Sequence, residues 1–364
     1  MAGAGGGEQI RIWQGMVAVF LFLLSLFAVS MSLNGFMKEW AGPDHLGVMD
    51  DKIDLFLTQK DEIDLIFMGT SRIYRNIDPL VFDSEMVSLG CPVRSFNFGV
   101  NLLTPVEGLY LLDRIRESQP KRLQWILFGQ MSLPRYFDWN WGSHRMRFFN
   151  TWSNLPLAAK DLWQSPLATR ERVVRLYRLL GSFLFEQLGI GRGSAYFFPM
   201  DNSKSGNGYR LTDTSHRGFL STDSETHPSF AERHDKFLQR DLKSYRDKVL
   251  TRGRAHRDVD ERSGAAQYKR LAPLLDRTRE MAVEPGIVMV PSYVTHLTSR
   301  PLLATAAKEN PNLPAWNFNQ PDKWPELFDW SHFFDVGHLN RPGASLFSRL
   351  LAQEICPDMQ ARGR

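Results

Sequence analysis

Short apolar runs and amphipathic segments alternate along much of the chain. Four of the runs have the length and composition of buried strands: Ile63–Gly69, Val93–Val100, Arg122–Gly129 and Gly286–Pro291. Apolar residues at helical spacing predict helices that begin at a Thr104/Glu107 capping box, cover Ala265–Ala282, and start near Pro342. Strands that alternate with helices in this way predict an α/β fold built on a parallel sheet.

Residues 131–261, between the third and fourth predicted strands, do not follow this alternation. Leu167–Leu188 and Phe230–Leu250 are amphipathic and predict helices, whereas Asp201–Ser224 is polar, rich in Gly and Ser, and predicts a loop. We interpret the segment as a largely helical insertion or lid. The predicted organisation is then a tail (1–15), a transmembrane anchor (16–36), a linker (37–62), a first core part (63–130), the insertion (131–261) and a second core part (262–364).

The anchor prediction depends on Met16–Leu33, a run without a single charged residue. Eighteen residues rise about 27 Å as a helix, close to the roughly 30 Å of a hydrocarbon core. A cleaved signal peptide is the alternative, with Ala28-Val29-Ser30 as a passable cleavage site. However, the run exceeds the roughly 7–15 apolar residues of a signal core. We therefore expect a retained single-pass anchor, with nearly everything after Trp40 on one side of the membrane.

Composition excludes several classes of protein. The chain has 364 residues and a formal net charge of +4, with 44 Lys and Arg against 40 Asp and Glu, so it lacks the basic excess of a nucleic-acid binder. Its two cysteines, Cys91 and Cys356, are too few for a zinc cluster or a disulfide framework. We interpret them as two free or buried thiols, with pairing in an oxidising compartment as the alternative. We predict neither a metal nor a cofactor.

Candidate chemistry lies at the ends of the predicted elements. Ser71 follows the first strand in Gly69-Thr70-Ser71-Arg72, at the sheet edge where ligands of open α/β sheets bind. Near the C-terminus, Asp335 precedes His338 by three residues on a turn, so the carboxylate can orient the imidazole. Together the three residues predict a nucleophile, a general base and its orienting acid. Taken separately, Ser71 reads as a helix N-cap, and the Asp–His pair as a structural contact or half of a metal site.

Three further residues are candidates for an oxyanion hole. Asn97 and Gly99 end the second strand, and Gln130 follows the third. Because parallel strands end at one edge of a sheet, a backbone N–H and side-chain amides from these positions can face Ser71. The alternative is that Asn97 and Gly99 are ordinary turn residues.

The order of these blocks resembles the SGNH (GDSL-type) hydrolase superfamily. It is most similar to the membrane-anchored, envelope-facing branch that includes DltD-like and AlgJ/AlgX-like O-acetylation proteins. The first block is Phe67–Arg72 followed by Ile77-Asp78-Pro79, and the last is Asp335–Gly343. Two positions depart from the superfamily pattern: Thr70 stands where Gly-Asp-Ser has Asp, and Gln130 is only the nearest amide to the third-block Asn.

The resemblance implies a three-layer, flavodoxin-like parallel sheet with Ser71 as nucleophile, His338 as base, Asp335 as its orienter and Gly99 as an oxyanion donor. It also implies an O-acyltransferase at the cytoplasmic membrane, with its soluble domain in the periplasm or outside the cell. Such a protein receives an acyl group, most often acetyl, from a multi-pass membrane O-acyltransferase and passes it to an envelope or exported polysaccharide. Two alternatives remain: a carbohydrate esterase with the same triad, and a non-catalytic partner of the membrane acyltransferase.

An aromatic segment at the start of the insertion bears on substrate binding. Residues 135–152 are crowded with aromatic residues, and we interpret these rings as a core or as residues at the bilayer interface, where Trp and Tyr are enriched. The alternative is that Trp139 and Trp141 stack on sugar rings as substrate contacts. Arg72 and Tyr293 are the other predicted substrate contacts.

Overall fold

The computed structural model describes residues 5–40, 46–131, 144–149, 151–165, 167–187, 211–225, 228–243, 261–293 and 296–362. The chain divides into two compact units. The N-terminal unit is Met1–Leu46, Arg135–Pro156 and Val173–Gly208, and the core unit is Gly47–Pro134, Leu157–Arg172 and Tyr209–Arg364. The segment 131–261, which we expected to be one insertion, is thus divided between the two units.

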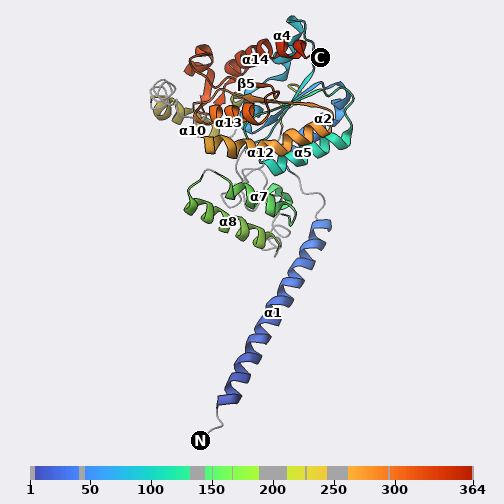
Figure 1. Cartoon of the computed structure of the whole chain (residues 1–364), viewed down its shortest axis with the longest axis vertical. Helices are drawn as coiled ribbons and strands as arrows, with labels where there is room; N and C mark the ends of the chain where they lie inside the picture. The colour runs from blue at the N-terminus through green and yellow to red at the C-terminus, as the bar shows by residue number, and fades with distance from the viewer. Residues whose placement is uncertain are drawn as a thin grey trace. The chain divides into compact units, whose positions relative to one another are not determined.

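The core unit is built on a five-stranded parallel sheet (Figure 1) with the order β2-β1-β3-β4-β5. This is the flavodoxin-like order of doubly wound sheets. The α/β prediction is confirmed, and a short fifth strand that the sequence did not reveal joins the predicted four. The strands are β1 (Leu65–Gly69), β2 (Ser95–Gly99), β3 (Trp125–Phe128), β4 (Glu284–Met289) and β5 (Ala315–Asn317).

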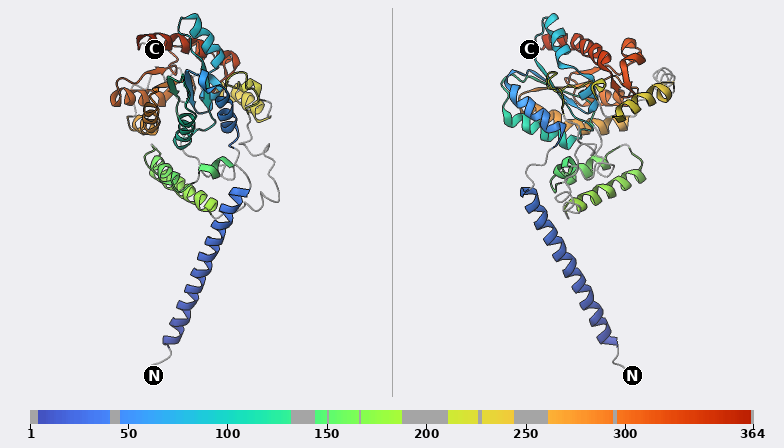
Figure 2. Two further views of the ribbon diagram at one scale, coloured as in Figure 1. Left: turned by 90° about the vertical axis from the view of Figure 1, so that its right-hand side faces the viewer. Right: turned by 180° about the vertical axis from the view of Figure 1, so that it is seen from behind.

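Helices cover both faces of this sheet, as Figures 1 and 2 show. On one face α14 packs against α4 and α3, and on the other α12 packs against α5 and α13. The capping box is present, because the Thr104 hydroxyl accepts the Glu107 N–H while the Glu107 carboxylate accepts the Thr104 N–H. The bounds are α2 (Val48–Gln59), α3 (Ser71–Asn76), α4 (Pro79–Ser88), α5 (Pro105–Ser118), α12 (Glu261–Glu280), α13 (His296–Glu309) and α14 (Arg341–Ala361).

Two pieces of the expected insertion pack on the core unit. Residues 211–225 form no strand and only the 3₁₀ turn Thr222–Ser224, as predicted for the polar loop, but residues 218–222 are buried, with Phe219 1% exposed. Their backbone follows the free edge of β2, where Arg217 O accepts the Asn97 N–H at 2.9 Å. The second piece is α10 (Pro228–Lys236), continued by the π-helical turn Phe237–Asp241. It lies against the two-stranded hairpin β6 (Phe333–Asp335) and β7 (His338–Leu339).

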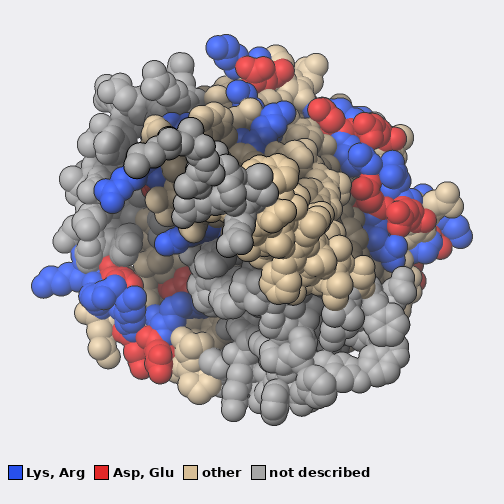
Figure 3. Space-filling model, turned by 90° about the horizontal axis from the view of Figure 1, so that it is seen from below, with Lys and Arg blue, Asp and Glu red and all other residues tan. Residues whose placement is uncertain are grey.

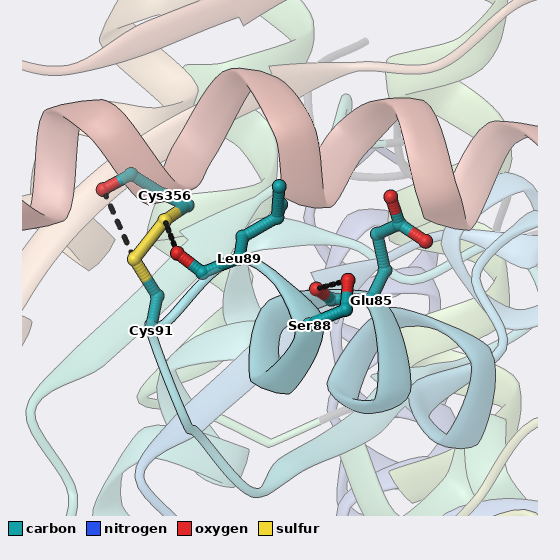
Figure 4. Close-up of a disulfide and its surroundings, with 5 residues drawn as sticks. All are labelled: Glu85, Ser88, Leu89, Cys91 and Cys356. Carbon is teal, nitrogen blue, oxygen red and sulfur yellow. Dashed lines mark hydrogen bonds between the residues drawn. A yellow bond between two sulfur atoms is a disulfide. The ribbon is translucent and has the colours of Figure 1, made fainter.

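The cysteine interpretation was wrong, because Cys91 and Cys356 form a disulfide. Cys91 follows α4 and Cys356 lies in α14, and Figure 4 shows the bond joining these neighbouring segments across 265 residues of sequence. The packing of α14 against α4 brings the two Cα atoms to 5.8 Å. That separation suits a disulfide, and only the tertiary fold creates it.

The N-terminal unit contains α1 (Gly5–Trp40), α6 (His144–Phe149) and most of α8 (Thr169–Gln187). Within α1, Ile12–Ser32 is long and apolar enough to cross a membrane. Its 21 residues rise roughly 31 Å, about the thickness of a hydrocarbon core. A signal sequence meets the same criteria, so the helix by itself fixes neither retention nor orientation. The helix α7 (Asn154–Trp163) begins in this unit and continues into the core unit.

Surface charges are mixed in sign. Over the coloured part of the face in Figure 3, Lys and Arg side chains alternate with Asp and Glu. Several described pairs are ion pairs one helical turn apart, among them Arg114–Glu117 on α5 and Arg279–Asp276 on α12. These are the solvated helix faces that the near-balanced composition predicts.

Candidate active site

Ser71 is the first residue of α3, directly after β1. Thr70, not Ser71, is the N-cap residue of this helix, which leaves the Ser71 hydroxyl available for a tertiary contact. The rest of the short helix is buried, including Ile73 and Tyr74. The sheet edge and the packing of α3 therefore fix the position of the hydroxyl.

The hairpin β6–β7 brings Asp335 and His338 to this helix. Asp335 Oδ1 accepts the main-chain N–H groups of Gly337 at 2.8 Å and His338 at 2.9 Å, which closes the tight turn. The Leu339 N–H then donates to Asn76 Oδ1 at 2.9 Å, so the hairpin is aligned with α3. Asn76, which the sequence analysis did not single out, thereby ties together segments that are 263 residues apart.

The three predicted residues form one hydrogen-bonded chain. His338 Nε2 lies 2.8 Å from Ser71 Oγ, and His338 Nδ1 lies 2.9 and 3.0 Å from the two carboxylate oxygens of Asp335. With the proton on Nδ1, Nε2 is the acceptor for the Ser71 hydroxyl. The His338 side chain is 17% exposed and that of Asp335 is 8% exposed, so the chain begins near solvent and ends in the interior.

Asp335 is held in its ionised form. Burial by itself would raise the pKa of this carboxyl, but His338, the Arg233 guanidinium and the Gly337 N–H together lower the pKa well below its usual range. An ionised carboxylate is the form that orients an imidazole and stabilises it when it gains a proton.

Helix α10 supplies a residue that sequence reasoning missed. Arg233 Nε lies 2.8 Å from Asp335 Oδ2, and its guanidinium also stands over the ring of Phe230, 4.5 Å from the centroid. One residue on, His234 Nδ1 lies 2.7 Å from the Phe334 carbonyl oxygen, and the rings of these two residues stack. No spacing in the sequence relates α10 to the hairpin, because their pairing depends on how the segment after residue 211 folds back.

Arg72 follows Ser71 in α3, and its side chain contacts Gln130 after β3. Arg72 Nη1 donates to Gln130 Oε1 at 3.1 Å, and Gln130 Nε2 donates in turn to Gln267 Oε1 at 3.4 Å. Burial lowers the pKa of Arg72 to about 10, opposed by the nearby Asp335 carboxylate, so the guanidinium is charged at neutral pH. The pair gives the site a fixed cation next to Ser71. A role for Gln130 as an oxyanion donor stays a prediction.

The assignment of Asn97 and Gly99 to an oxyanion hole was wrong. Asn97 is 0% exposed. Its amide donates to the carbonyl oxygens of Ile73 at 2.9 Å and Ile77 at 2.7 Å, while its Oδ1 accepts the Gly99 N–H at 2.9 Å. Both groups are thus engaged in holding α3 against β2. Gly99 is needed for a different reason, because a Cβ there would lie 2.2 Å from Tyr74 N.

The buried Lys52 completes this second network. Its Nζ donates to Asn97 O at 2.9 Å and to Gly99 O at 2.6 Å, and stands 3.7 Å from the centroid of the Tyr74 ring. Desolvation, with a smaller contribution from Arg75, lowers the pKa of Lys52 well below its ordinary value. The polar groups described at the end of β2 therefore form a structural cluster, in which they hydrogen-bond to one another and to the end of α3.

The remaining predicted contacts divide into two groups. Tyr293 is a core residue: its ring packs 4.3 Å from that of Phe333 and its hydroxyl donates to Phe328 O at 2.6 Å, so its assignment to substrate was wrong. Trp139 and Trp141 lie outside the described residues. Among the residues that the structure describes, no group of three or more His, Cys, Asp or Glu is arranged to hold a metal ion.

Comparison with known proteins adds no family assignment. No protein-family model matches the sequence, and no curated protein matches it either.

Proposed function

We propose that the protein is a membrane-anchored SGNH-type O-acyltransferase, which transfers an acyl group, acetyl foremost, to a hydroxyl of an envelope or exported polysaccharide. The observation that carries this proposal is the 2.8 Å contact between Ser71 Oγ and His338 Nε2, with Nδ1 of the same ring on Asp335. A serine hydroxyl, an imidazole and a buried carboxylate in this order are the arrangement used for acyl transfer through an acyl-serine.

The reaction has two balanced steps. In the first, Ser71 Oγ attacks the carbonyl carbon of an acyl donor while His338 Nε2 takes the hydroxyl proton. The donor's leaving oxygen then departs with that proton, and acetyl-Ser71 remains. In the second, a sugar hydroxyl gives its proton to Nε2 and attacks the acyl carbon, and Ser71 Oγ leaves and recovers the proton. We assign the stabilisation of the negative charge that develops on the carbonyl oxygen to Arg72, which follows Ser71 and is charged at neutral pH.

The Cys91–Cys356 disulfide supports the proposed location. Disulfides persist in oxidising compartments and are rare in the cytosol. Since this bond lies in the core unit, it favours a core unit on the periplasmic or outer side of the membrane. The apolar stretch Ile12–Ser32 of α1 would then hold the protein at the cytoplasmic membrane. There it can meet the proposed acyl donor, a multi-pass membrane O-acyltransferase, at high effective concentration.

Acetyl transfer to Ser71 is directly measurable. The full chain in detergent is incubated with p-nitrophenyl acetate, and the peptide that contains Ser71 is analysed by mass spectrometry. We expect one acetyl group on Ser71 that persists in buffer and is discharged when an acceptor polysaccharide is added. Ser71→Ala abolishes the label, whereas Ser88→Ala, which removes an exposed hydroxyl on α4, leaves it unchanged.

Other results would replace the proposal with one of its alternatives. Rapid loss of the acetyl group to water, unaffected by polysaccharide, indicates an esterase. A wild-type chain that never acquires the label, combined with full function of Ser71→Ala in cells, indicates a non-catalytic partner of the membrane acyltransferase.

A further inference from the structure

Helix α8 has an exposed apolar stripe. Val173, Tyr177, Leu180 and Leu184 follow one another at intervals of four, three and four residues, so their side chains share one face of the helix. Their exposed fractions are 51%, 77%, 43% and 50%. Single exposed apolar residues are common on protein surfaces, but a continuous stripe along three turns marks a contact surface.

This stripe is additional to the face by which α8 packs. Leu179 and Phe183 are 1% and 2% exposed, and the Phe183 ring contacts that of Trp152 edge-on, with the centroids 4.6 Å apart. At 100° per residue, Phe183 lies roughly 90° and Leu179 roughly 130° around the helix from the centre of the stripe, both on the same side of it. The apolar surface of the helix is therefore wider than the face that packs, and the stripe is a part of that surface that stays exposed.

An exposed charged residue borders the stripe. Arg170 lies roughly 50° from the centre of the stripe at 100° per residue, and the helix as a whole carries four arginines (Arg170, Arg172, Arg175, Arg178) against two glutamates (Glu171, Glu186). An apolar stripe with a tyrosine and a bordering arginine is typical of helices that lie in the interface of a bilayer, with the arginine at the level of the lipid headgroups.

We propose that the Val173–Leu184 stripe of α8 rests on the bilayer that α1 enters, with anionic lipid headgroups opposite Arg170 at its edge. One observation favours lipid over a protein partner. The same compact unit contains both the stripe and the apolar stretch Ile12–Ser32 of α1, so a membrane is within reach of the stripe whenever α1 is inserted. The inference requires α1 in the membrane but does not require acyl transfer.

The test measures where the stripe lies in the intact protein. Tyr177→Cys and Leu180→Cys are each labelled with the environment-sensitive fluorophore NBD under non-reducing conditions, so that the native disulfide does not react. Glu117→Cys on α5, a residue whose side chain is 57% exposed, is the matched control in the core unit. Each labelled chain is placed alone in nanodiscs made of equal parts phosphatidylcholine and phosphatidylglycerol. Fluorescence is then quenched either by spin-labelled lipid or by aqueous iodide.

For positions 177 and 180 we expect spin-labelled lipid to lower the fluorescence roughly twofold and iodide to have little effect, because an interfacial helix buries its apolar face among the lipids. Position 117 should behave in the opposite way. Adding Val173→Asp and Leu184→Asp should make the fluorophore at position 177 accessible to quenching by iodide. Quenching of 177 and 180 by iodide but not by lipid would overturn the proposal. So would protection from both quenchers that persists in detergent and appears together with chemically cross-linked dimers, because that indicates a second copy on the stripe.

Discussion

Polar residues stand at the ends of both β1 and β2, but their hydrogen-bonding roles differ. After β1, the Ser71 hydroxyl has the imidazole of His338 as its partner and stands at the partly exposed end of a chain that leads inward to Asp335. At the end of β2, the Gly99 N–H donates to the Asn97 amide oxygen, and the Asn97 amide nitrogen donates to Ile73 O in α3. Lys52 Nζ donates to the main-chain carbonyl oxygens of both Asn97 and Gly99.

The difference lies in how many hydrogen bonds each group has already made. A buried polar group must be satisfied within the protein, and once satisfied it has little left to offer a ligand. Asn97 is fully buried and bonded at both ends of its amide, whereas Ser71 is half-buried and bonded to a titratable ring. Position at the sheet edge is therefore not sufficient to make a residue part of a site.

The largest expected effect is a loss of acetyl transfer caused by a substitution at the end of β1. Ser71→Ala should lower the rate of acetyl transfer from p-nitrophenyl acetate by roughly 10⁴-fold or more, because the acyl-serine cannot form. Its free energy of unfolding in urea should change by less than about 1 kcal/mol, as for other half-exposed substitutions. A variant that transfers acetyl at the wild-type rate would remove Ser71 from the reaction.

For a substitution at the end of β2 we expect the reverse: a large loss of stability with little loss of acetylation rate. Asn97→Ala takes the amide partner from the Ile77 carbonyl and the Gly99 N–H, whereas the Ile73 carbonyl keeps the Ile77 N–H. At about 1–3 kcal/mol for each of the two groups left without this partner, unfolding in urea should show a loss of about 2–6 kcal/mol. Acetylation of Ser71 per folded molecule should stay within about tenfold of wild type, since one oxyanion donor is worth about 10²–10³ in rate. A loss of rate above that range, with normal stability, would return Asn97 to the oxyanion hole.

Arg233→Gln tests whether Arg233 in α10 holds Asp335 in its ionised form. Loss of the guanidinium beside Asp335 should raise the pKa of that carboxyl, followed by NMR of the labelled Asp side chain, and should lower the acetylation rate by about tenfold. Arg233→Lys keeps the charge and should recover most of the rate. If Gln and Lys variants lose the same rate and the pKa of Asp335 is unmoved, Arg233 serves only to pack α10.

The smallest effect concerns stability in acid. Because the pKa of Asp335 is lowered in the folded state, the carboxylate stabilises the fold at pH values above about 3.9, its unfolded pKa. That contribution is lost as the pH falls toward the folded pKa. Asp335→Asn should therefore flatten the decline of unfolding free energy below about pH 4, as measured by urea titration at several pH values. An unchanged dependence of the unfolding free energy on pH would show that other carboxylates account for the loss of stability in acid.

Much of the core was predictable because its signals are local. The four strand runs, the Thr104/Glu107 capping box and the helix after Pro342 depend on spacings of a few residues, and each is present in the structure. The triad positions were predictable for a related reason. Ser71 directly follows the first strand, and His338 comes just before the last helix. Parallel strands end at one edge of the sheet, which is where ligands of open α/β sheets bind.

Tyr293 shows where such reasoning fails. It follows a strand at the same sheet edge, yet its ring turns into the core against Phe333, because the hairpin β6–β7 and the segment around Phe328 close over it. The short strands β5, β6 and β7 have two or three residues each, too few for a periodic pattern to reveal.

By itself, the sequence determined the α/β layering, the apolar N-terminal helix and the identity of the serine, histidine and aspartate that meet. Only the tertiary structure decided that Cys91 and Cys356 are bonded, that Arg233 reaches Asp335, and that Asn97 and Gly99 are engaged elsewhere. The physical reason is the range of the interactions. Helices, strands and caps are fixed by neighbours along the chain. A polar group becomes available or engaged only when segments distant along the chain close around it, 24 residues apart for Asn97 and Ile73 and 263 residues apart for Leu339 and Asn76.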